Sequence, residues 1–96
     1  MAGDYYVYIL ANRRNGTLYT GVTNDLRHRI WQHKDKSIAG FTRRYGVDRL
    51  VYFEAFRHIA NAIAREKQIK AGSRRRKLEM IERGNPAWND LSEGWY

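Results

Sequence analysis

The first 34 residues constrain the fold of this 96-residue chain most strongly. Tyr5 to Leu10 are mostly β-branched and aromatic residues, which favour a β-strand. Asn15-Gly16 follows and is typical of a tight hairpin turn, because both residue types readily adopt positive φ. Thr17 to Val22 is then the returning strand, and a helix is predicted from there to about Lys34. The chain therefore begins with a β-hairpin that leads directly into a helix.

A two-residue turn at Asn15-Gly16 sets the expected register of this hairpin. It pairs Leu10 with Gly21, although a one-residue bulge would disturb the pairing. Side chains alternate between the two faces of a strand. One face is therefore expected to carry Tyr6, Tyr8, Tyr19 and Gly21. Glycine has no side chain, so Gly21 should leave a gap between the tyrosines.

The helix that follows carries two polar residues on its apolar side. At about 100° per residue, Arg29 and His33 fall on the side that holds Leu26 and Ile30. A histidine in such a place is often a core residue whose ring bonds to a backbone carbonyl. An arginine there can bury its stem and keep its charge in water. Structural and functional roles therefore both remain open for these two residues.

Two more elements are predicted after a polar loop and a short helical turn over 41–45. Arg49 to Phe56 reads as a third strand, and its nearly continuous apolar run indicates burial on both faces. His58 to Lys70 reads as a helix with Ile59, Ala62, Ile63 and Ile69 on one side. Glu66 lies about 20° from Ile59 on this helix, within the apolar stripe. A carboxylate facing a core is rare unless it is paired or binds a metal, so an ion pair and a metal role remain open.

The chain is strongly basic, with a formal net charge of +8 that suits a polyanionic partner. Ser73 is expected to cap a last helix over 74–82, whose first turn is crowded with cations. The helix dipole disfavours cations there, and a bound phosphate would relieve the conflict. A solvated basic turn is the alternative. The candidates for nucleic-acid contact are Arg43, Arg44, Lys70, Arg74, Arg75, Arg76 and Lys77.

Composition narrows the remaining classes of protein. The absence of cysteine excludes disulfides and thiolate zinc sites, and it favours a reducing, cytoplasmic setting. The N-terminus, Met1-Ala2-Gly3-Asp4, lacks the basic and apolar regions of a signal peptide. The longest apolar run, Tyr5 to Ala11, falls far short of the roughly 20 residues of a membrane helix. The length fits one domain over residues 1–96.

An ordered set of motifs runs through nearly the whole chain, from residue 5 to about residue 90. It comprises Tyr6-Val7-Tyr8, Asn15-Gly16, Tyr19-Thr20-Gly21, Arg29, His33 and Glu66. In this order and spacing it resembles the GIY-YIG endonuclease domain family, and most closely its small stand-alone bacterial members. The chain departs from the family pattern at Tyr6, where the first motif has glycine, and at Thr20, where the second has isoleucine.

The resemblance implies an α+β fold with a three-stranded antiparallel sheet flanked by helices. It also implies an endonuclease that hydrolyses DNA phosphodiesters with one Mg²⁺ or Mn²⁺ ion. The implied catalytic residues are Tyr8, Tyr19, Arg29, His33 and Glu66, with Glu66 as the metal ligand. Gly21 and a C-terminal asparagine, Asn85 rather than Asn89, are expected to shape the site. A domain this small has no room for a targeting module, so a protein partner could supply specificity.

The main alternative is a nucleic-acid-binding module of the same fold without turnover. The basic charge supports that reading equally well. Binding alone, however, does not require Glu66 in an apolar stripe. A third reading is an interaction domain that uses Trp88 and Trp95 near the C-terminus.

Overall fold

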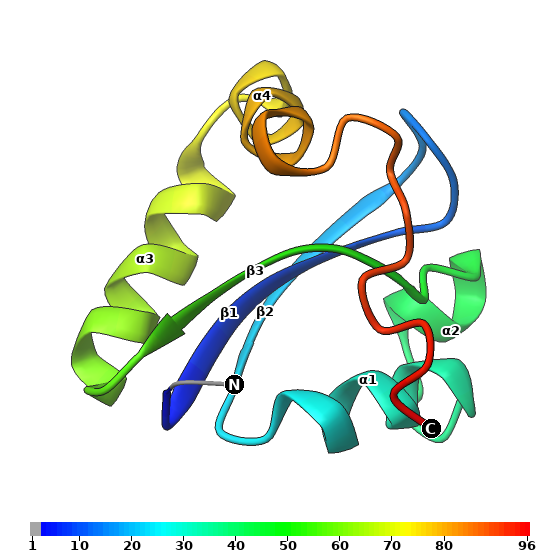
Figure 1. Ribbon diagram of the computed structural model, residues 1–96, viewed down its shortest axis with the longest axis horizontal. Helices are drawn as coiled ribbons and strands as arrows, with labels where there is room; N and C mark the ends of the chain where they lie inside the picture. The colour runs from blue at the N-terminus through cyan, green and yellow to red at the C-terminus, as the bar shows by residue number, and fades with distance from the viewer. Residues whose placement is uncertain (1–2) are drawn as a thin grey trace.

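The computed structural model describes residues 3–96 and contains one antiparallel sheet with helices on both faces (Figure 1). Met1 and Ala2, which belong to the segment judged not to be a signal peptide, lie outside the described residues. The elements in chain order are β1 (Tyr5–Ala11), β2 (Leu18–Thr23), α1 (Leu26–Lys34), α2 (Phe41–Tyr45), β3 (Arg49–Phe56), α3 (Ile59–Ala71) and α4 (Arg74–Gly84). The predicted α+β class with three antiparallel strands is confirmed.

The predicted hairpin register is wrong by two residues. Gly21 pairs with Tyr8 instead of Leu10, because the turn is longer than two residues. The Asn12 amide donates to the Thr17 carbonyl at 3.3 Å, so residues 13–16 form a four-residue turn. Within that turn Asn15 takes a positive φ of 56°. A slip of two residues leaves every side chain on its predicted face, so the tyrosines and Gly21 still share one side.

Strand β1 is the central strand, and the sheet order is β2-β1-β3. The expectation that β3 is buried on both faces is wrong, because β3 is an edge strand. Leu50 and Val51 are fully buried, whereas Ala55 near its end is exposed. A continuous apolar run therefore did not identify the central strand here.

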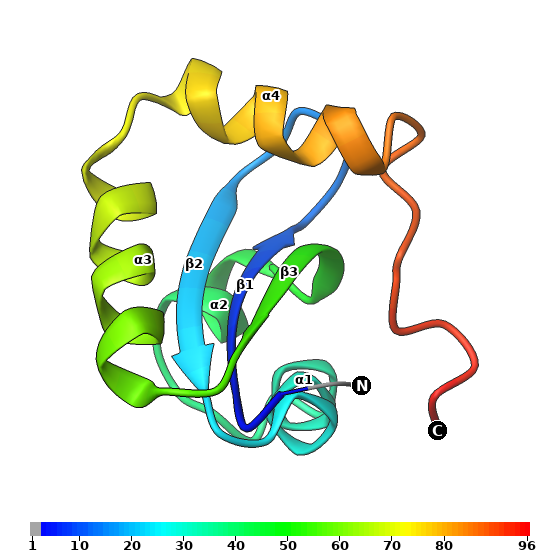
Figure 2. The same cartoon turned by 60° about the vertical axis from the view of Figure 1, so that its left-hand side comes forward.

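The sheet lies between two pairs of helices, with α3 and α4 on one face and α1 and α2 on the other (Figure 2). It separates two hydrophobic clusters. On the side of α3 and α4 the buried cluster contains Val7, Ile9, Ala11, Val51, Ala62, Ile69, Ile81 and Trp88. On the side of α1 it contains Tyr6, Tyr8, Leu10, Leu26, Ile30, Val47 and Leu50. Trp88 is fully buried, so the segment after α4 packs back on the domain. In the described part of the chain, no helix is long and apolar enough to span a bilayer.

The predicted apolar stripe of α3 is partly wrong. Ile59 and Ile63 are exposed, whereas Ala62 and Ile69 are buried. Helix α3 packs against β1 and β2 through the side that carries small Ala62, and this rotates the two isoleucines toward solvent. Glu66 then lies at the border of the packed side, with 15% of its side chain exposed.

Candidate active site

A chain of three buried polar side chains joins the sheet to both helices on one face. The Tyr8 hydroxyl lies 3.0 Å from His33 Nε2. His33 Nδ1 lies 2.9 Å from Thr42 Oγ1. Tyr8 comes from β1, His33 from α1 and Thr42 from α2, and all three are buried. The expectation of a backbone carbonyl partner for His33 is therefore wrong, because both ring nitrogens bond to side chains.

Tyr19 on β2 completes what we call the tyrosine–histidine cluster, defined as Tyr8, Tyr19, His33 and Thr42. Its ring centroid lies 6.3 Å from that of Tyr8 and 5.7 Å from that of His33. Arg29 on α1 is half-buried. Burial first and the Arg29 charge second lower the pKa of His33, whereas at Tyr8 the same charge only offsets part of the rise in pKa that burial causes. Arg29 and His33 thus lie on the packed side of α1, as predicted.

The cluster holds Tyr8 and His33 in their neutral forms. Burial raises the pKa of the Tyr8 phenol well above its ordinary value, and Tyr19 and Glu66 add to the rise. Burial and the Arg29 charge together lower the pKa of His33 to about 4. Near pH 7 His33 is therefore a neutral imidazole, which donates a hydrogen bond from one ring nitrogen and accepts one at the other.

The low pKa of His33 predicts a loss of stability in acid. Unfolded His33 binds a proton below its ordinary pKa of 6.5, whereas folded His33 stays neutral down to about 4. Stability is therefore full above pH 6.5 and falls as the pH drops toward 4, by on the order of 2–3 kcal/mol. Denaturant unfolding at several pH values measures this, and the loss should shrink in His33→Gln but not in His28→Gln, an exposed histidine on the same helix. Equal slopes in both variants would contradict the assignment.

Gly21 lies directly opposite Tyr8 and leaves room for its ring. A Cβ atom at Gly21 would stand 2.5 Å from both Cζ and Oη of Tyr8. The Tyr8 ring is 1% exposed and bonded to His33, so it has little freedom to move away. The predicted gap between the tyrosines therefore exists, and it is the space that the Tyr8 phenol fills.

Gly21→Ala is expected to lower the free energy of unfolding by about 1–3 kcal/mol, because overpacking forces buried side chains out of place. It should also move the Tyr8 phenol away from His33. Gly84→Ala is a matched control, since no atom lies within 4 Å of a Cβ built there. Thermal unfolding of both variants measures the difference, and equal stabilities would rule out the close contact.

Glu66 approaches the cluster from α3, and its negative charge raises the pKa of Tyr8. Its Oε2 atom also pairs with Lys70 Nζ at 2.8 Å, one helical turn on. Among residues 3–96, no group of three or more histidine, aspartate and glutamate side chains could hold a metal ion. A lone carboxylate fits Mg²⁺, which keeps several waters and takes its other ligands from substrate phosphates. The structure therefore allows a metal at Glu66 only as an open, mostly hydrated site.

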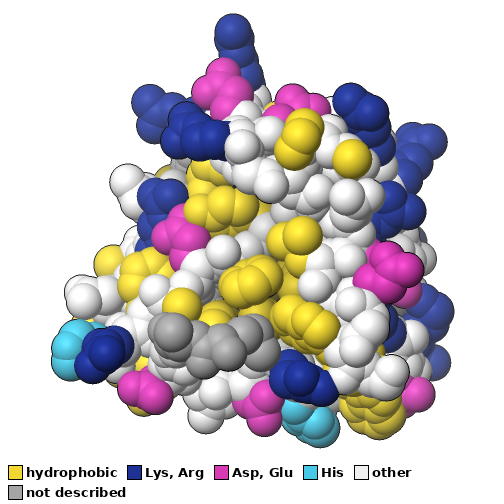
Figure 3. Space-filling model, viewed as in Figure 1, with side chains coloured by type: hydrophobic (Ala, Val, Ile, Leu, Met, Phe, Trp, Pro, Cys, Tyr) yellow, Lys and Arg dark blue, Asp and Glu magenta, His cyan; other side chains and the backbone are white. Residues whose placement is uncertain are grey.

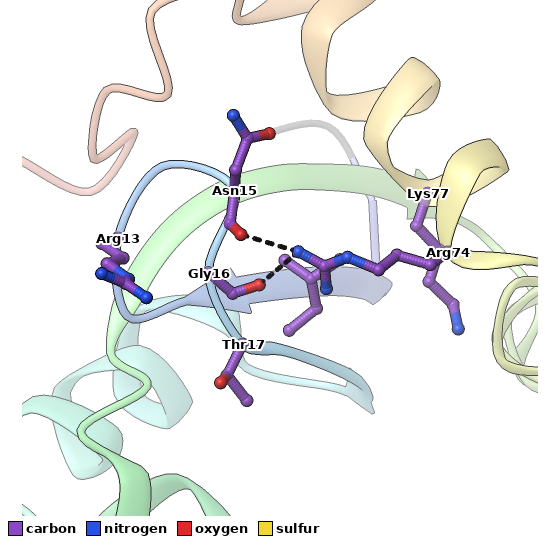
Figure 4. Close-up of a pocket in the computed structure, with 7 residues that line it drawn as sticks. Arg13, Asn15, Gly16, Thr17, Arg74 and Lys77 are labelled. Carbon is purple, nitrogen blue, oxygen red and sulfur yellow. Dashed lines mark hydrogen bonds between the residues drawn. The ribbon is translucent and has the colours of Figure 1, made fainter.

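Most of the basic residues predicted to contact nucleic acid lie exposed on α2, α3 and α4. Figure 3 shows Lys and Arg side chains gathered at the top of one face, over α4, and along the right-hand edge. Arg74 is already engaged, since its guanidinium donates to the carbonyls of Asn15 and Gly16 at 2.8 and 2.7 Å (Figure 4). Arg75 pairs with Glu79. Contact of Arg43, Arg44, Lys70, Arg74, Arg75, Arg76 and Lys77 with nucleic acid stays a prediction.

Asn85 lies apart from the tyrosine–histidine cluster, just after α4. Its amide nitrogen donates to the carbonyls of Val51 and Asn89, at 3.2 and 2.9 Å. Its amide oxygen accepts from the Asn89 backbone at 3.0 Å. These bonds hold the C-terminal segment against β3, which is a structural contribution.

Thr42 is the residue of this site that sequence reasoning missed. It lies nine positions after His33, in a short helix between two runs of loop, with no helical or strand spacing that links it to the histidine. The sequence signal was the short helical turn between two glycines. In the structure both glycines take a positive φ, 115° at Gly40 and 63° at Gly46. Such a fixed turn beside a histidine is a place to look for a second partner of the ring.

Comparison with known proteins gives consistent results. The family model described as the GIY-YIG catalytic domain matches residues 4–79. A UPF0213 protein of Clostridium perfringens is 45% identical over 76 residues, which cover 79% of this chain and 81% of that protein. A UPF0213 protein of Staphylococcus saprophyticus is 38% identical over 80 residues, covering 83% and 96%. The solution NMR structure of a UPF0213 protein from Bacillus halodurans has 36% identity and a TM-score of 0.56, covering 94% of this chain and 96% of that one.

Proposed function

The chain belongs to the GIY-YIG family, and on that premise we propose that it is a metal-dependent endonuclease that cuts DNA in repair, recombination or processing. The observation that carries the proposal is the bonded chain Tyr8–His33–Thr42, with the charges of Arg29 and Glu66 both acting on the Tyr8 phenol. A proton acceptor, a cation and a carboxylate thus lie around one phenol. Each of these three kinds of group can accelerate the hydrolysis of a phosphodiester.

We assign the remaining roles from the chemistry of each side chain. Arg29 presents a planar fork that suits two phosphate oxygens and offsets the negative charge that grows in the transition state. Glu66 is the proposed ligand of one Mg²⁺ or Mn²⁺, and the Lys70 ammonium would move away from the carboxylate when the ion binds. When bound, the ion neutralises the phosphate oxygens and stabilises the leaving 3′ oxygen. Tyr19 borders the phosphate position from β2 and is the second candidate to hold the attacking water.

We assign proton transfer to Tyr8 because His33 lies 3.0 Å from its hydroxyl. A free phenolate is disfavoured, since burial raises the pKa of Tyr8. The hydroxyl therefore accepts the proton of the attacking water while it gives its own proton to His33 Nε2. This transfer requires the tautomer with hydrogen on Nδ1, and Thr42 Oγ1 at 2.9 Å accepts that hydrogen. Thr42 is thus a positioning residue that acts through His33.

Thr42→Val should slow cleavage about 10-fold, because valine has the shape of threonine but cannot accept the Nδ1 hydrogen. Thr42→Ser keeps the hydroxyl and should restore the rate. Cleavage rates across pH 5–9 provide the measurement, since a changed His33 tautomer should also shift the acidic limb of the profile. If the valine variant loses activity but keeps the wild-type profile and serine fails to rescue, Thr42 serves packing alone.

Nicking of supercoiled plasmid DNA tests the proposed function. With Mg²⁺ or Mn²⁺ the protein should convert closed circles to open circles, and a chelator should stop the conversion. A catalytically silent binding module of the same fold is the alternative, and the net charge of +8 favours it equally. Salt-sensitive DNA binding with no nicking under either metal would establish that alternative. A partner protein that supplies specificity would appear as nicking in a cell extract that exceeds the nicking by the extract alone and by the extract with Glu66→Gln.

A further inference from the structure

We propose that Phe41 and Tyr45 on α2 form a base-stacking platform for an unpaired nucleotide beside the scissile phosphate. The inference rests on the proposed function and adds a substrate class to it. Both rings are exposed to solvent, with Phe41 45% and Tyr45 48% exposed. Their centroids lie 4.9 Å apart at an interplanar angle of 49°. Together they offer solvent a contiguous aromatic surface of the kind on which nucleic-acid bases stack.

The platform adjoins the tyrosine–histidine cluster. The Phe41 ring stacks on Tyr19, with centroids 6.3 Å apart and an interplanar angle of 27°. Tyr19, Phe41 and Lys70 line one shallow hollow, and Phe41, Arg44 and Tyr45 line the next. A nucleic-acid strand whose phosphate lies at Tyr19 would therefore place a neighbouring base over Phe41 and Tyr45.

Two arginines give this aromatic surface the charge that a nucleotide requires. Arg43 and Arg44 lie exposed on the same helix, and the Arg44 guanidinium carbon lies 5.5 Å from the centre of the Tyr45 ring. Aromatic faces that receive bases beside cations that track phosphates are typical of single-strand binding sites. A purely apolar partner would leave both arginine charges without a counter-charge, so the surface favours a nucleotide.

The orientation of the platform is tied to the site through one residue. Thr42 lies between the platform rings in sequence and bonds to His33. Helix α2 therefore cannot turn its aromatic face without moving the partner of the histidine. Bases within a duplex are stacked on each other, and exposing one costs a few kcal/mol. We therefore expect preference for single strands, flaps or gaps over intact duplex.

Binding of the full-length protein to 2-aminopurine oligonucleotides in chelator tests the platform without cleavage. On single strands the fluorescence should fall as the base stacks, and the affinity should exceed that for the matched duplex. Phe41→Ala and Tyr45→Ala should each weaken single-strand binding about 5- to 150-fold and duplex binding far less. Trp31→Ala is the matched control, because Trp31 is 44% exposed on α1 and stacks on His28 instead.

The two variants also guard against a folding defect. Phe41 contacts Tyr19, whereas Tyr45 contacts mainly Phe41 and Arg44, so Tyr45→Ala should fold even if Phe41→Ala does not. Unchanged single-strand affinity in Tyr45→Ala, or equal losses on single strand and duplex, would overturn the platform. If Tyr45→Ala then still nicks plasmid DNA at the wild-type rate, the platform is wrong but the proposed nuclease function is retained.

Discussion

Replacement of Glu66 by glutamine should slow metal-dependent cleavage by at least about 10³-fold while DNA binding and the fold are retained. Glutamine has the shape of glutamate but lacks the charge that would hold a divalent cation. The fold should tolerate the change because the ion pair with Lys70 has a half-exposed lysine, and such pairs contribute roughly 0–1 kcal/mol. Nicking rates with Mg²⁺, thermal unfolding and DNA-binding anisotropy together measure the three expectations.

A matched control for this variant lies on α4. Glu79 also forms an ion pair across one helical turn, with Arg75, but it is exposed and does not contribute to the raised pKa of Tyr8. Glu79→Gln should therefore leave cleavage unchanged. If Glu66→Gln cuts DNA as fast as Glu79→Gln, Glu66 is a structural partner of Lys70 and the metal role is wrong. If Glu66→Gln unfolds, the carboxylate holds α3 against the sheet instead.

Much of the fold could be predicted because local patterns and tertiary packing agree. The hairpin, α1 and the third strand follow from β-branched runs, a turn signal and helical spacing, and the structure places all of them. The register could not be predicted, because Arg13-Arg14-Asn15-Gly16 closes a four-residue turn as readily as Asn15-Gly16 closes a two-residue one. The burial of β3 could not be predicted either, because an apolar run does not indicate which strand is central in the sheet.

The candidate site was predictable where polar residues interrupt the apolar pattern of a helix. Arg29 and His33 lie on the packed side of α1, and Glu66 lies at the border of the packed side of α3. His33 bonds to Tyr8, and the charges of Arg29 and Glu66 act on the Tyr8 phenol. The predicted apolar stripe of α3 that contained Glu66 was nevertheless partly wrong, because Ile59 and Ile63 are exposed to solvent. Packing on a sheet favoured Ala62, whose small side chain permits close approach. Thr42 carried no periodic signal, since it contacts His33 only through the tertiary fold.

Arg29→Ala should lower the cleavage rate by about 10²–10³-fold, because it removes the fork proposed to bind the phosphate. It should also leave a signature that does not depend on activity. The charge of Arg29 is the second cause, after burial, of the low pKa of His33. Without it, the His33 pKa should rise from about 4 but stay below 6.5, because burial remains. NMR titration of the His33 ring measures this shift.

Arg29→Lys separates the charge of Arg29 from its shape. Lysine keeps the positive charge, so the His33 pKa should stay near 4, but it lacks the planar pair of donors. Cleavage should therefore stay low in Arg29→Lys although the electrostatics are restored. Arg27→Ala on the exposed side of α1 is the control, and it should change neither the pKa nor the rate. Full activity in Arg29→Lys would show that only the charge matters, and unfolding of Arg29→Ala would assign the arginine to the structure alone.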